Sequence, residues 1–230
     1  LREYLEGVLR TSSTRLSYPI RVHSVREAAR SGAALLVDGD ITVRTAPLTH
    51  RVPAFAYRVE QQPRPGRFDV ERARALGLPP GPLYAALKAG HTVTLDDGRV
   101  IAGASLCGPP RPGNSVVYCT DTTFSEAAVD LAKGADLLIH EATFAHGEAA
   151  MAIQRQHSTS TMAAQTALAA GVRQLALTHL SPRYVPGNPI TAEDLLLEAR
   201  AIFPETVLAN DFLTLTLEDR ETAGTHRPTA

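Results

Sequence analysis

The sequence predicts an α/β fold, because three short apolar runs alternate with helical stretches in the second half of the chain. Each run ends on a polar side chain; the runs are residues 116–121, ending at Asp121, 137–141, ending at Glu141, and 175–179, ending at His179. Buried strands of α/β sheets have this apolar composition, and ligands bind where such strands stop. The three polar side chains are therefore expected to converge at one edge of a sheet.

Capping residues mark the helices between and after these runs. Ser, Thr and Asp start helices by accepting backbone N–H bonds, and Gly ends them in a left-handed conformation. The first of these helices is expected to start at a capping box of Thr123 and Glu126 and to end at Gly134. The second is expected to start at Ser158 or Thr159 and to end at Gly171, and the third to start at Thr191 with Asp194. This order predicts helices packed on a sheet.

The first part of the chain has shorter signals. The spacing of apolar residues predicts a helix over residues 1–9 and strands at 19–22 and 41–48. The chain starts at Leu1 without a signal or transit-peptide pattern, and we interpret this start as an N-terminal truncation. Residues 218–230 carry no apolar pattern and are expected to form a flexible tail.

Residues 58–113 have a different composition and predict an insertion. Prolines and glycines punctuate them, with short helices expected near 69–76 and 83–89. The Asp97-Gly98 pair lies between two β-prone runs and predicts a hairpin. Basic residues slightly outnumber acidic ones, which is a weak signal for nucleic-acid binding. A stalk with a small head is the expected shape.

Composition limits the class of protein. The 230 residues are 44% hydrophobic with a formal net charge of −1, which suits one or two domains with a core. Near-neutral charge gives no global argument for a nucleic-acid partner. The two cysteines, Cys107 and Cys119, are too few for a disulfide framework and favour a cytoplasmic location, and no apolar stretch reaches the roughly 18 residues of a membrane span.

The expected sheet edge carries only part of a metal site. Imidazole and carboxylate ligands at strand ends suit zinc, but the sequence contains neither His-x-His nor Asp-His. Other interpretations stay open: His50 alone is an ordinary polar residue, Asp121 can cap a helix beginning near Phe124, and Glu141 can be a buried hydrogen-bonding group. For His140 a structural role is expected.

Several motifs in fixed order resemble ribonuclease Z, a tRNA 3′-processing endonuclease of the metallo-β-lactamase superfamily. They are Val117-Tyr118-Cys119-Thr120-Asp121-Thr122, Ile139-His140-Glu141-Ala142-Thr143-Phe144, His157-Ser158-Thr159, Leu177 to Tyr184, and, upstream, Ala46-Pro47-Leu48-Thr49-His50 with the stretch from Leu78 to Tyr84. The resemblance implies a metallo-β-lactamase-like αββα sandwich that is N-terminally truncated. Residues 1–57 would be the remainder of the N-terminal half of this domain, and residues 58–113 a protruding tRNA-binding arm. Residues 114–217 would be the C-terminal half, followed by the flexible tail at 218–230.

The resemblance also implies a centre with two zinc ions. Asp121 matches the carboxylate that both ions share, and His50 and His179 each match a ligand of one ion. The family draws its other ligands from a His-x-His-x-Asp-His loop that lies upstream of the part matched here. With two protein ligands for each ion, the chain as given is expected to bind zinc weakly and to be inactive.

Four further residues receive roles from the same resemblance. His157, oriented by Glu141, matches the group that handles the proton of the leaving oxygen, and imidazole suits this role because its pKa lies near neutrality. Ser181 and Arg183 follow the expected ligand His179 and are positioned to hold a substrate phosphate.

The leading functional hypothesis is a zinc-dependent endoribonuclease that removes the 3′ trailer of precursor tRNA. The resemblance implies a homodimer in which the arm grips tRNA and presents it to the active site of the partner subunit. No membrane partner is expected. One alternative is another phosphodiesterase or arylsulfatase-like hydrolase of the superfamily, against which the arm motif argues. The other is a non-catalytic truncated chain that binds RNA or dimerises.

Overall fold

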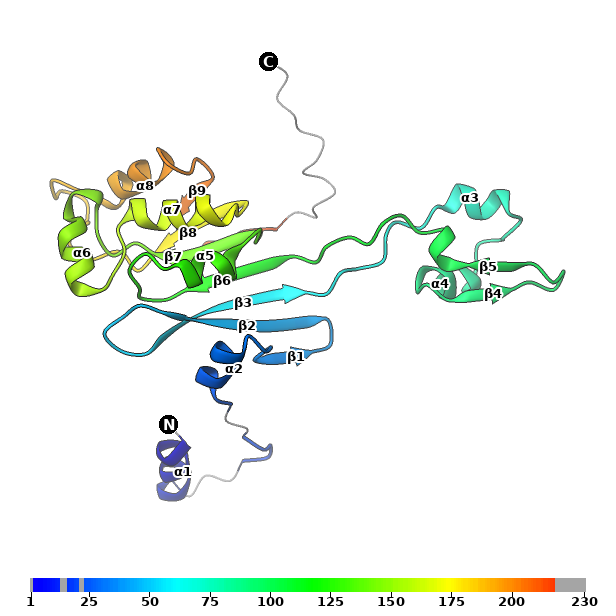
Figure 1. Ribbon diagram of the computed structural model, residues 1–230, viewed down its shortest axis with the longest axis horizontal. Helices are drawn as coiled ribbons and strands as arrows, with labels where there is room; N and C mark the ends of the chain where they lie inside the picture. Colours follow the sequence, from blue (N-terminus) through cyan, green and yellow to red (C-terminus); the bar gives the residue numbers. More distant parts are fainter. Residues whose placement is uncertain (1, 13–15, 21–22, 218–230) are drawn as a thin grey trace, which may run out of the picture.

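The structure is a computed structural model, which describes residues 2–12, 16–20 and 23–217. An α/β domain lies beside a long arm, and a helix lies at the N-terminal end (Figure 1). The elements are α1 (Arg2–Thr11), α2 (Val25–Ser31), β1 (Leu36–Asp38), β2 (Ile41–Leu48), β3 (Ala54–Gln61), α3 (Val70–Ala75), α4 (Pro82–Lys88), β4 (Thr92–Thr94), β5 (Val100–Ala102), η1 (Gly103–Ser105), β6 (Ser115–Cys119), α5 (Glu126–Ala132), β7 (Leu137–Glu141), η2 (His146–Glu148), α6 (Ala149–Arg155), α7 (Ser160–Ala170), β8 (Gln174–Thr178), α8 (Ala192–Arg200) and β9 (Thr206–Leu208).

One seven-stranded sheet organises the domain, in the order β1-β2-β3-β6-β7-β8-β9. The pairs from β1 to β6 are antiparallel, and β6 to β9 are parallel to one another. Cys119 pairs with His140, and Glu141 pairs with Thr178. The carboxyl ends of β6, β7 and β8 therefore meet at one edge, which confirms the α/β fold class.

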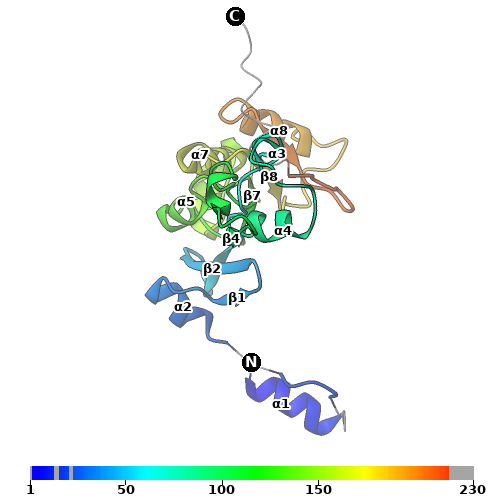
Figure 2. The ribbon, with the colours of Figure 1, turned by 90° about the vertical axis from the view of Figure 1, so that its right-hand side faces the viewer.

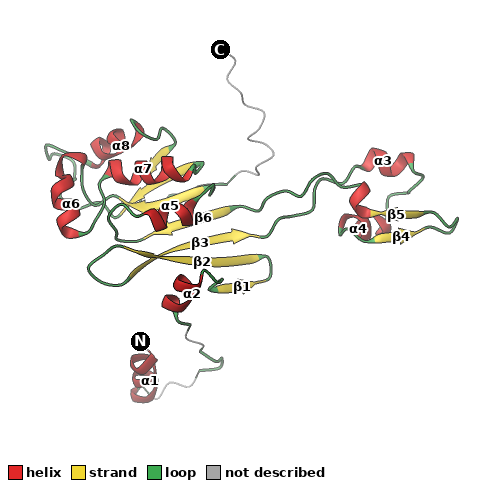
Figure 3. Cartoon of the chain, in the orientation of Figure 1, coloured by secondary structure: helices red, strands yellow, loops and turns green. Residues whose placement is uncertain are grey.

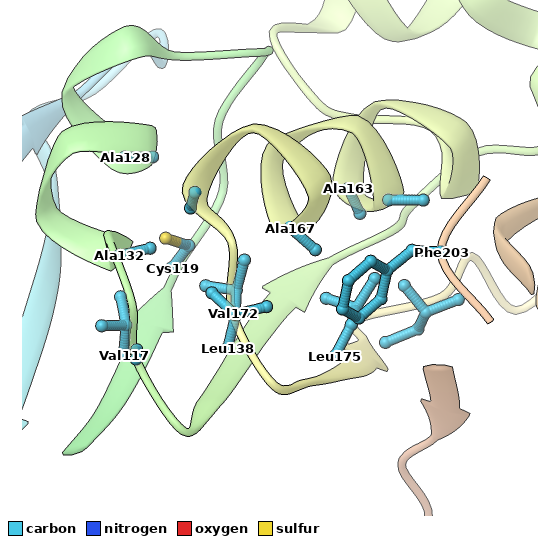
Figure 4. Packing of buried hydrophobic residues seen from close by; sticks show 14 of the residues in the cluster. Val117, Cys119, Ala128, Ala132, Leu138, Ala163, Ala167, Val172, Leu175 and Phe203 are labelled. Atoms are coloured by element: carbon cyan, nitrogen blue, oxygen red, sulfur yellow. The ribbon is translucent and has the colours of Figure 1, made fainter. Parts of the chain in front are cut away.

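The core lies between this sheet and helices α5, α7 and α8 (Figure 4). The helices contribute mostly alanines, such as Ala128, Ala163 and Ala167, and the strands contribute larger side chains, such as Leu138 and Leu175. Small side chains on a helix let its backbone lie close to the sheet, so that the larger strand residues fill the layer between. This packing fixes the strand ends relative to one another.

The opposite face of the sheet is apolar and partly open. Tyr57 pairs with Tyr118 and Val59 with Val116, so these four side chains lie away from the helices, next to Ile139. Tyr118 is 45% exposed and Val59 42%. Among the described residues the second sheet of an αββα sandwich is not present. We refer to these five residues as the open face.

The chain between β3 and β6, residues 62–114, is called the arm here. It leaves the sheet through two segments without regular structure and ends in a head of α3, α4 and the β4–β5 hairpin (Figures 1 and 3). The head has its own core, made of Ala73, Leu78, Tyr84, Leu87, Ile101 and Leu106. Figure 2 shows the head in front of the sheet when the molecule is viewed along the arm.

The two chain segments approach closely where the arm joins the sheet. The N–H of Gln61 donates to the carbonyl of Asn114 at 2.9 Å. A Cβ atom at Gly113 would lie 2.1 Å from the Gln61 carbonyl oxygen, so only glycine fits there. The predicted hairpin is confirmed, with Gly98 at its turn in a left-handed conformation (φ +83°).

Most predicted boundaries are confirmed. The strand at 41–48 and the helices near 1–9, 69–76 and 83–89 are present. Thr159 caps α7 and Gly171 ends it, and Thr191 and Asp194 form the capping box of α8.

Other expectations are wrong or fall elsewhere. The cap of α5 is Ser125, whose hydroxyl accepts from the Ala128 N–H, and not Thr123, because the Thr123 N–H donates to the Thr49 carbonyl before the helix starts. Pro19 and Ile20 are not in a strand, whereas residues 21–22 and the tail 218–230 lie outside the described residues. The division at residues 57 and 113 remains a prediction; β3 itself continues to Gln61.

Candidate metal centre

Five predicted residues gather at the carboxyl edge of the parallel strands, and we call them the metal centre: His50, Asp121, Glu141, His157 and His179. Glu141 ends β7, Asp121 and His179 follow β6 and β8, and the other two come from the β2–β3 turn and the link between α6 and α7. His50 Nε2 lies 3.7 Å from Asp121 Oδ2, and His179 Nε2 lies 3.6 Å from Asp121 Oδ1. Each imidazole thus faces a different oxygen of one carboxylate.

The His50 ring is held in one tautomer by the backbone. Its Nδ1 lies 2.7 Å from the carbonyl oxygen of Gln156, and a carbonyl can only accept. Nδ1 therefore carries the proton, and Nε2 presents a lone pair toward Asp121. The side chain is 4% exposed, so packing also restrains it.

Glu141 is a buried carboxylate with four donors. Its Oε1 accepts from the Thr122 N–H and from His157 Nδ1, both at 2.9 Å. Its Oε2 accepts from the Thr143 N–H at 2.9 Å and from the Thr143 hydroxyl at 2.7 Å. These bonds satisfy the carboxylate and direct the other nitrogen of His157 into the centre.

The donor geometry fits metal ions between Asp121 and the two imidazoles. A zinc ion bonded to nitrogen and oxygen at tetrahedral angles would separate the two atoms by roughly 3.4 Å. The observed separations of 3.6 and 3.7 Å are close to this value and are too long for hydrogen bonds. His157 also lies within reach of the His50–Asp121 pair, and a second group that could hold a metal joins it to Glu141 and His179.

Arg183 and Ser181 lie in the loop after His179, and other groups already engage them. Arg183 Nη1 bonds Glu148 Oε1 at 2.7 Å, and its Nε donates to the Ser181 hydroxyl at 3.2 Å. Tyr184 also donates to Glu148, and burial together with this carboxylate raises the pKa of Tyr184 to about 12. The loop is thereby anchored to Glu148, with the Arg183 side chain 47% exposed.

His140 is buried beside the centre, on the helix side of the sheet. Its Nδ1 lies 2.7 Å from the Glu141 carbonyl oxygen, and its Nε2 has no hydrogen-bond partner among the described residues. Burial lowers the pKa of His140, so the ring is neutral at physiological pH. This environment agrees with the structural role expected for it.

Two features at or beside the centre were not predicted from the sequence. Thr143 contacts Glu141, His157 and His179 through one hydroxyl, and its position two residues after Glu141 on an extended segment is the only sequence signal for it. Helix α2 was not expected either. Its Arg26 and Arg30 line a pocket of about 360 Å³ that reaches His50.

Known proteins resemble this chain closely in sequence. A ribonuclease Z of Synechococcus sp. (strain CC9605) is 69% identical over 220 residues, which are 96% of this chain and 69% of the relative. Ribonuclease Z of Synechococcus sp. (strain WH7803) is 71% identical over 215 residues, covering 94% of this chain and 67% of the relative. A scan against protein-family models gives no match.

A solved structure resembles this chain in fold. The short form of human tRNase Z superposes with a TM-score of 0.54 at 20% identity, covering 95% of this chain and 65% of the human chain. This similarity concerns the fold. The bacterial relatives, at 69% and 71% identity over two thirds or more of their length, decide the family. The chain belongs to the ribonuclease Z family.

Proposed function

We propose that the protein is an endonuclease that removes the 3′ trailer of precursor tRNA with two zinc ions at the metal centre. The observation that carries the proposal is the pair of imidazole nitrogens facing opposite oxygens of Asp121, next to the Glu141–His157 pair. Membership of the ribonuclease Z family supports the same substrate.

The residues divide into metal-holding and proton-handling groups. His50 with Asp121 would hold one ion and His179 with Asp121 the other. Bound zinc would lower the pKa of the attacking water and stabilise the negative charge on the phosphate. His157 would protonate the 3′ oxygen of the tRNA as its bond to phosphorus breaks, and Glu141 keeps the His157 ring in the required orientation.

Basic residues of the arm, where its two connecting segments reach the head, support the proposal of an RNA partner. A cavity of about 510 Å³ there is lined by Arg64, Arg67, Lys88 and Arg111, with Phe68 beside them. Clustered cations attract a phosphate backbone. We therefore propose that this part of the arm contacts the body of tRNA.

The topology supports presentation of tRNA to a partner subunit. β3 leads into the arm and β6 leads out of it, whereas Asp121 follows the other end of β6 (Figure 1). The arm and the metal centre thus lie at opposite ends of the same strands. We therefore propose that in a homodimer an RNA held by the arm is cut at the centre of the partner subunit.

Metal binding by the 230-residue chain is expected to be weak. The described residues offer two donors for each ion, or three for the ion at His50 and Asp121 if His157 joins, and stable catalytic zinc sites have at least three. Ser181 and Arg183 remain the proposed phosphate contacts. A cytoplasmic location also remains a prediction, with two unpaired thiols in agreement with it. None of the described helices is long and apolar enough to cross a membrane.

The test compares two proteins on a precursor tRNA with added zinc. One is the chain itself, and the other is a chimaera that adds the N-terminal segment of a similar ribonuclease Z with its His-x-His-x-Asp-His loop. The chimaera should release the trailer and leave a 3′-hydroxyl, and the chain alone should not cleave. Cleavage by the chain alone would refute the account of the metal site, and a chimaera active only on small phosphodiesters would support the alternative hydrolase.

A further inference from the structure

We propose that Thr143 is a positioning residue that fixes the tautomer of His179 and thereby makes its Nε2 a metal ligand. The proposal rests on the proposed metal centre. Thr143 lies two residues after Glu141 and is buried. Its hydroxyl oxygen lies 2.7 Å from Glu141 Oε2 and 2.8 Å from His179 Nδ1.

The directions of these two bonds follow from the number of protons available. A threonine hydroxyl has one proton and can accept through its lone pairs, whereas a carboxylate only accepts. The bond to Glu141 therefore uses the hydroxyl proton. Toward His179 the hydroxyl must accept, so His179 Nδ1 carries a proton and Nε2 is left with a lone pair. Glu141 thus sets the tautomer of His179 through Thr143.

His179 needs this restraint more than His50 does. Its side chain is 51% exposed, whereas that of His50 is 4% exposed. Its backbone is in the left-handed region (φ +56°), which non-glycine residues adopt only when their surroundings hold them. His50 bonds a backbone carbonyl, which can only accept, but the partner of His179 is a hydroxyl, which can act in either direction.

Thr143 also holds the backbone of the same loop. The Ser181 N–H donates to the Thr143 carbonyl at 3.2 Å, and the Thr143 N–H donates to Glu141 Oε2. The residue therefore contacts the loop twice, at the ligand His179 through its hydroxyl and at Ser181 through its carbonyl. Only the hydroxyl contact is lost when the side chain is replaced by one of equal shape.

One carboxylate consequently serves two histidines. Glu141 Oε1 orients His157 directly, and Oε2 orients His179 through Thr143. The Thr143 hydroxyl also lies 3.2 Å from His157 Nδ1, but that nitrogen lies closer to Glu141 Oε1, at 2.9 Å. Removal of the hydroxyl should therefore affect His179 most and leave the Glu141–His157 bond in place.

The experiment uses Thr143→Val, which removes the hydroxyl but keeps the shape, and Thr143→Ser, which keeps the hydroxyl. Nitrogen NMR of the imidazoles in the metal-free chain, at a pH where they are neutral, reports which nitrogen carries the proton. Wild type and Thr143→Ser should show the Nδ1–H form of His179, and Thr143→Val should shift it toward the Nε2–H form. His50 is the internal reference and should not change in any protein.

Zinc affinity, measured by competition with a chelator, gives the second readout. Thr143→Val should weaken binding about 10- to 100-fold, the usual effect of losing a group that orients a ligand, and Thr143→Ser should bind within a few-fold of wild type. If Thr143→Val does not fold, loss of the Nδ1–H form in Thr143→Ser would itself overturn the proposal, and its retention would support it.

The two readouts separate this proposal from the proposed function. An unchanged His179 tautomer in folded Thr143→Val would overturn the role of Thr143, whatever the protein does with RNA. A changed tautomer with unchanged zinc affinity would show that His179 is not a ligand, which would overturn the proposed metal assignment instead.

Discussion

Replacement of Leu87 in the arm by alanine is expected to unfold the head of the arm while the sheet stays folded. Leu87 is fully buried in the small core of the head, beside Leu78, Tyr84 and Leu106. The change removes three carbon groups, at about 0.8 kcal/mol each, and the remaining cavity raises the cost to roughly 3–5 kcal/mol. A core of six buried residues supplies only a few kcal/mol, so most of the stability of the head should be lost.

Hydrogen exchange measured by mass spectrometry is the assay, because peptides of the arm and of the sheet report separately. In Leu87→Ala, peptides within 68–106 should exchange quickly while peptides within 115–178 keep their protection. Leu138→Ala is the matched control, since Leu138 is also fully buried but belongs to the core of the sheet. It should destabilise the peptides of the sheet.

Binding of tRNA, measured by gel shift, connects this result to function. Leu87→Ala should bind tRNA at least ten-fold more weakly, since the head no longer presents a fixed surface. Equal loss of protection in both regions would refute the claim that the head has a separate core. Unchanged tRNA affinity with an unfolded head would refute the proposed role of the arm.

Three other predictions concern the centre, a helix cap and the open face. In the chimaera, Asp121→Ala and His157→Ala should each reduce cleavage of precursor tRNA by at least 100-fold. Only Asp121→Ala should also reduce zinc affinity. A comparable loss of zinc affinity in His157→Ala would identify His157 as a ligand instead. Thr191→Ala should cost about 1 kcal/mol in urea unfolding, because it removes the cap of α8. The backbone and hydroxyl bonds from Thr191 lower the pKa of Asp194. The contribution of Asp194 to the free energy of unfolding is therefore present above the unfolded pKa and is lost as the pH falls through the folded pKa. This pH dependence should vanish in Asp194→Asn, and an acid unfolding profile equal to that of wild type would contradict it. Tyr118→Lys should reduce self-association in analytical ultracentrifugation without lowering the unfolding temperature, whereas equal self-association would show that the open face is not responsible.

Local composition explains which elements were predictable from sequence. The strand at 41–48 matches because the β-branched residues Ile41, Thr42, Val43 and Thr45 favour a strand. Helix α2 was not predictable, because its seven residues bury no side chain completely and a helix of this length is marginal by itself. The start of α5 was misplaced since Thr123 and Ser125 are both good caps, and a bond from Thr123 to the β2–β3 turn decides between them.

At the metal centre, too, local sequence signals were predictable and contacts made by tertiary packing were not. The rule that ligands lie at strand ends located Asp121, Glu141 and His179 from the apolar runs alone. His50 and His157 come from a turn and an interhelical link, so their convergence depends on tertiary packing and was inferred from family resemblance. Thr143 was missed because the role of a hydroxyl depends on which neighbours can donate, and sequence does not give those neighbours.

The junction of the arm has a consequence for how this family can change. Residues 62–114 leave and re-enter the sheet at Gln61 and Asn114, which bond each other directly, and the head shares no core residue with the sheet. Insertions, deletions or whole replacements between these two residues can therefore preserve the register of β3 and β6. Under the role proposed for the arm, changes in this one segment would alter the binding of substrate without moving the residues of the metal centre.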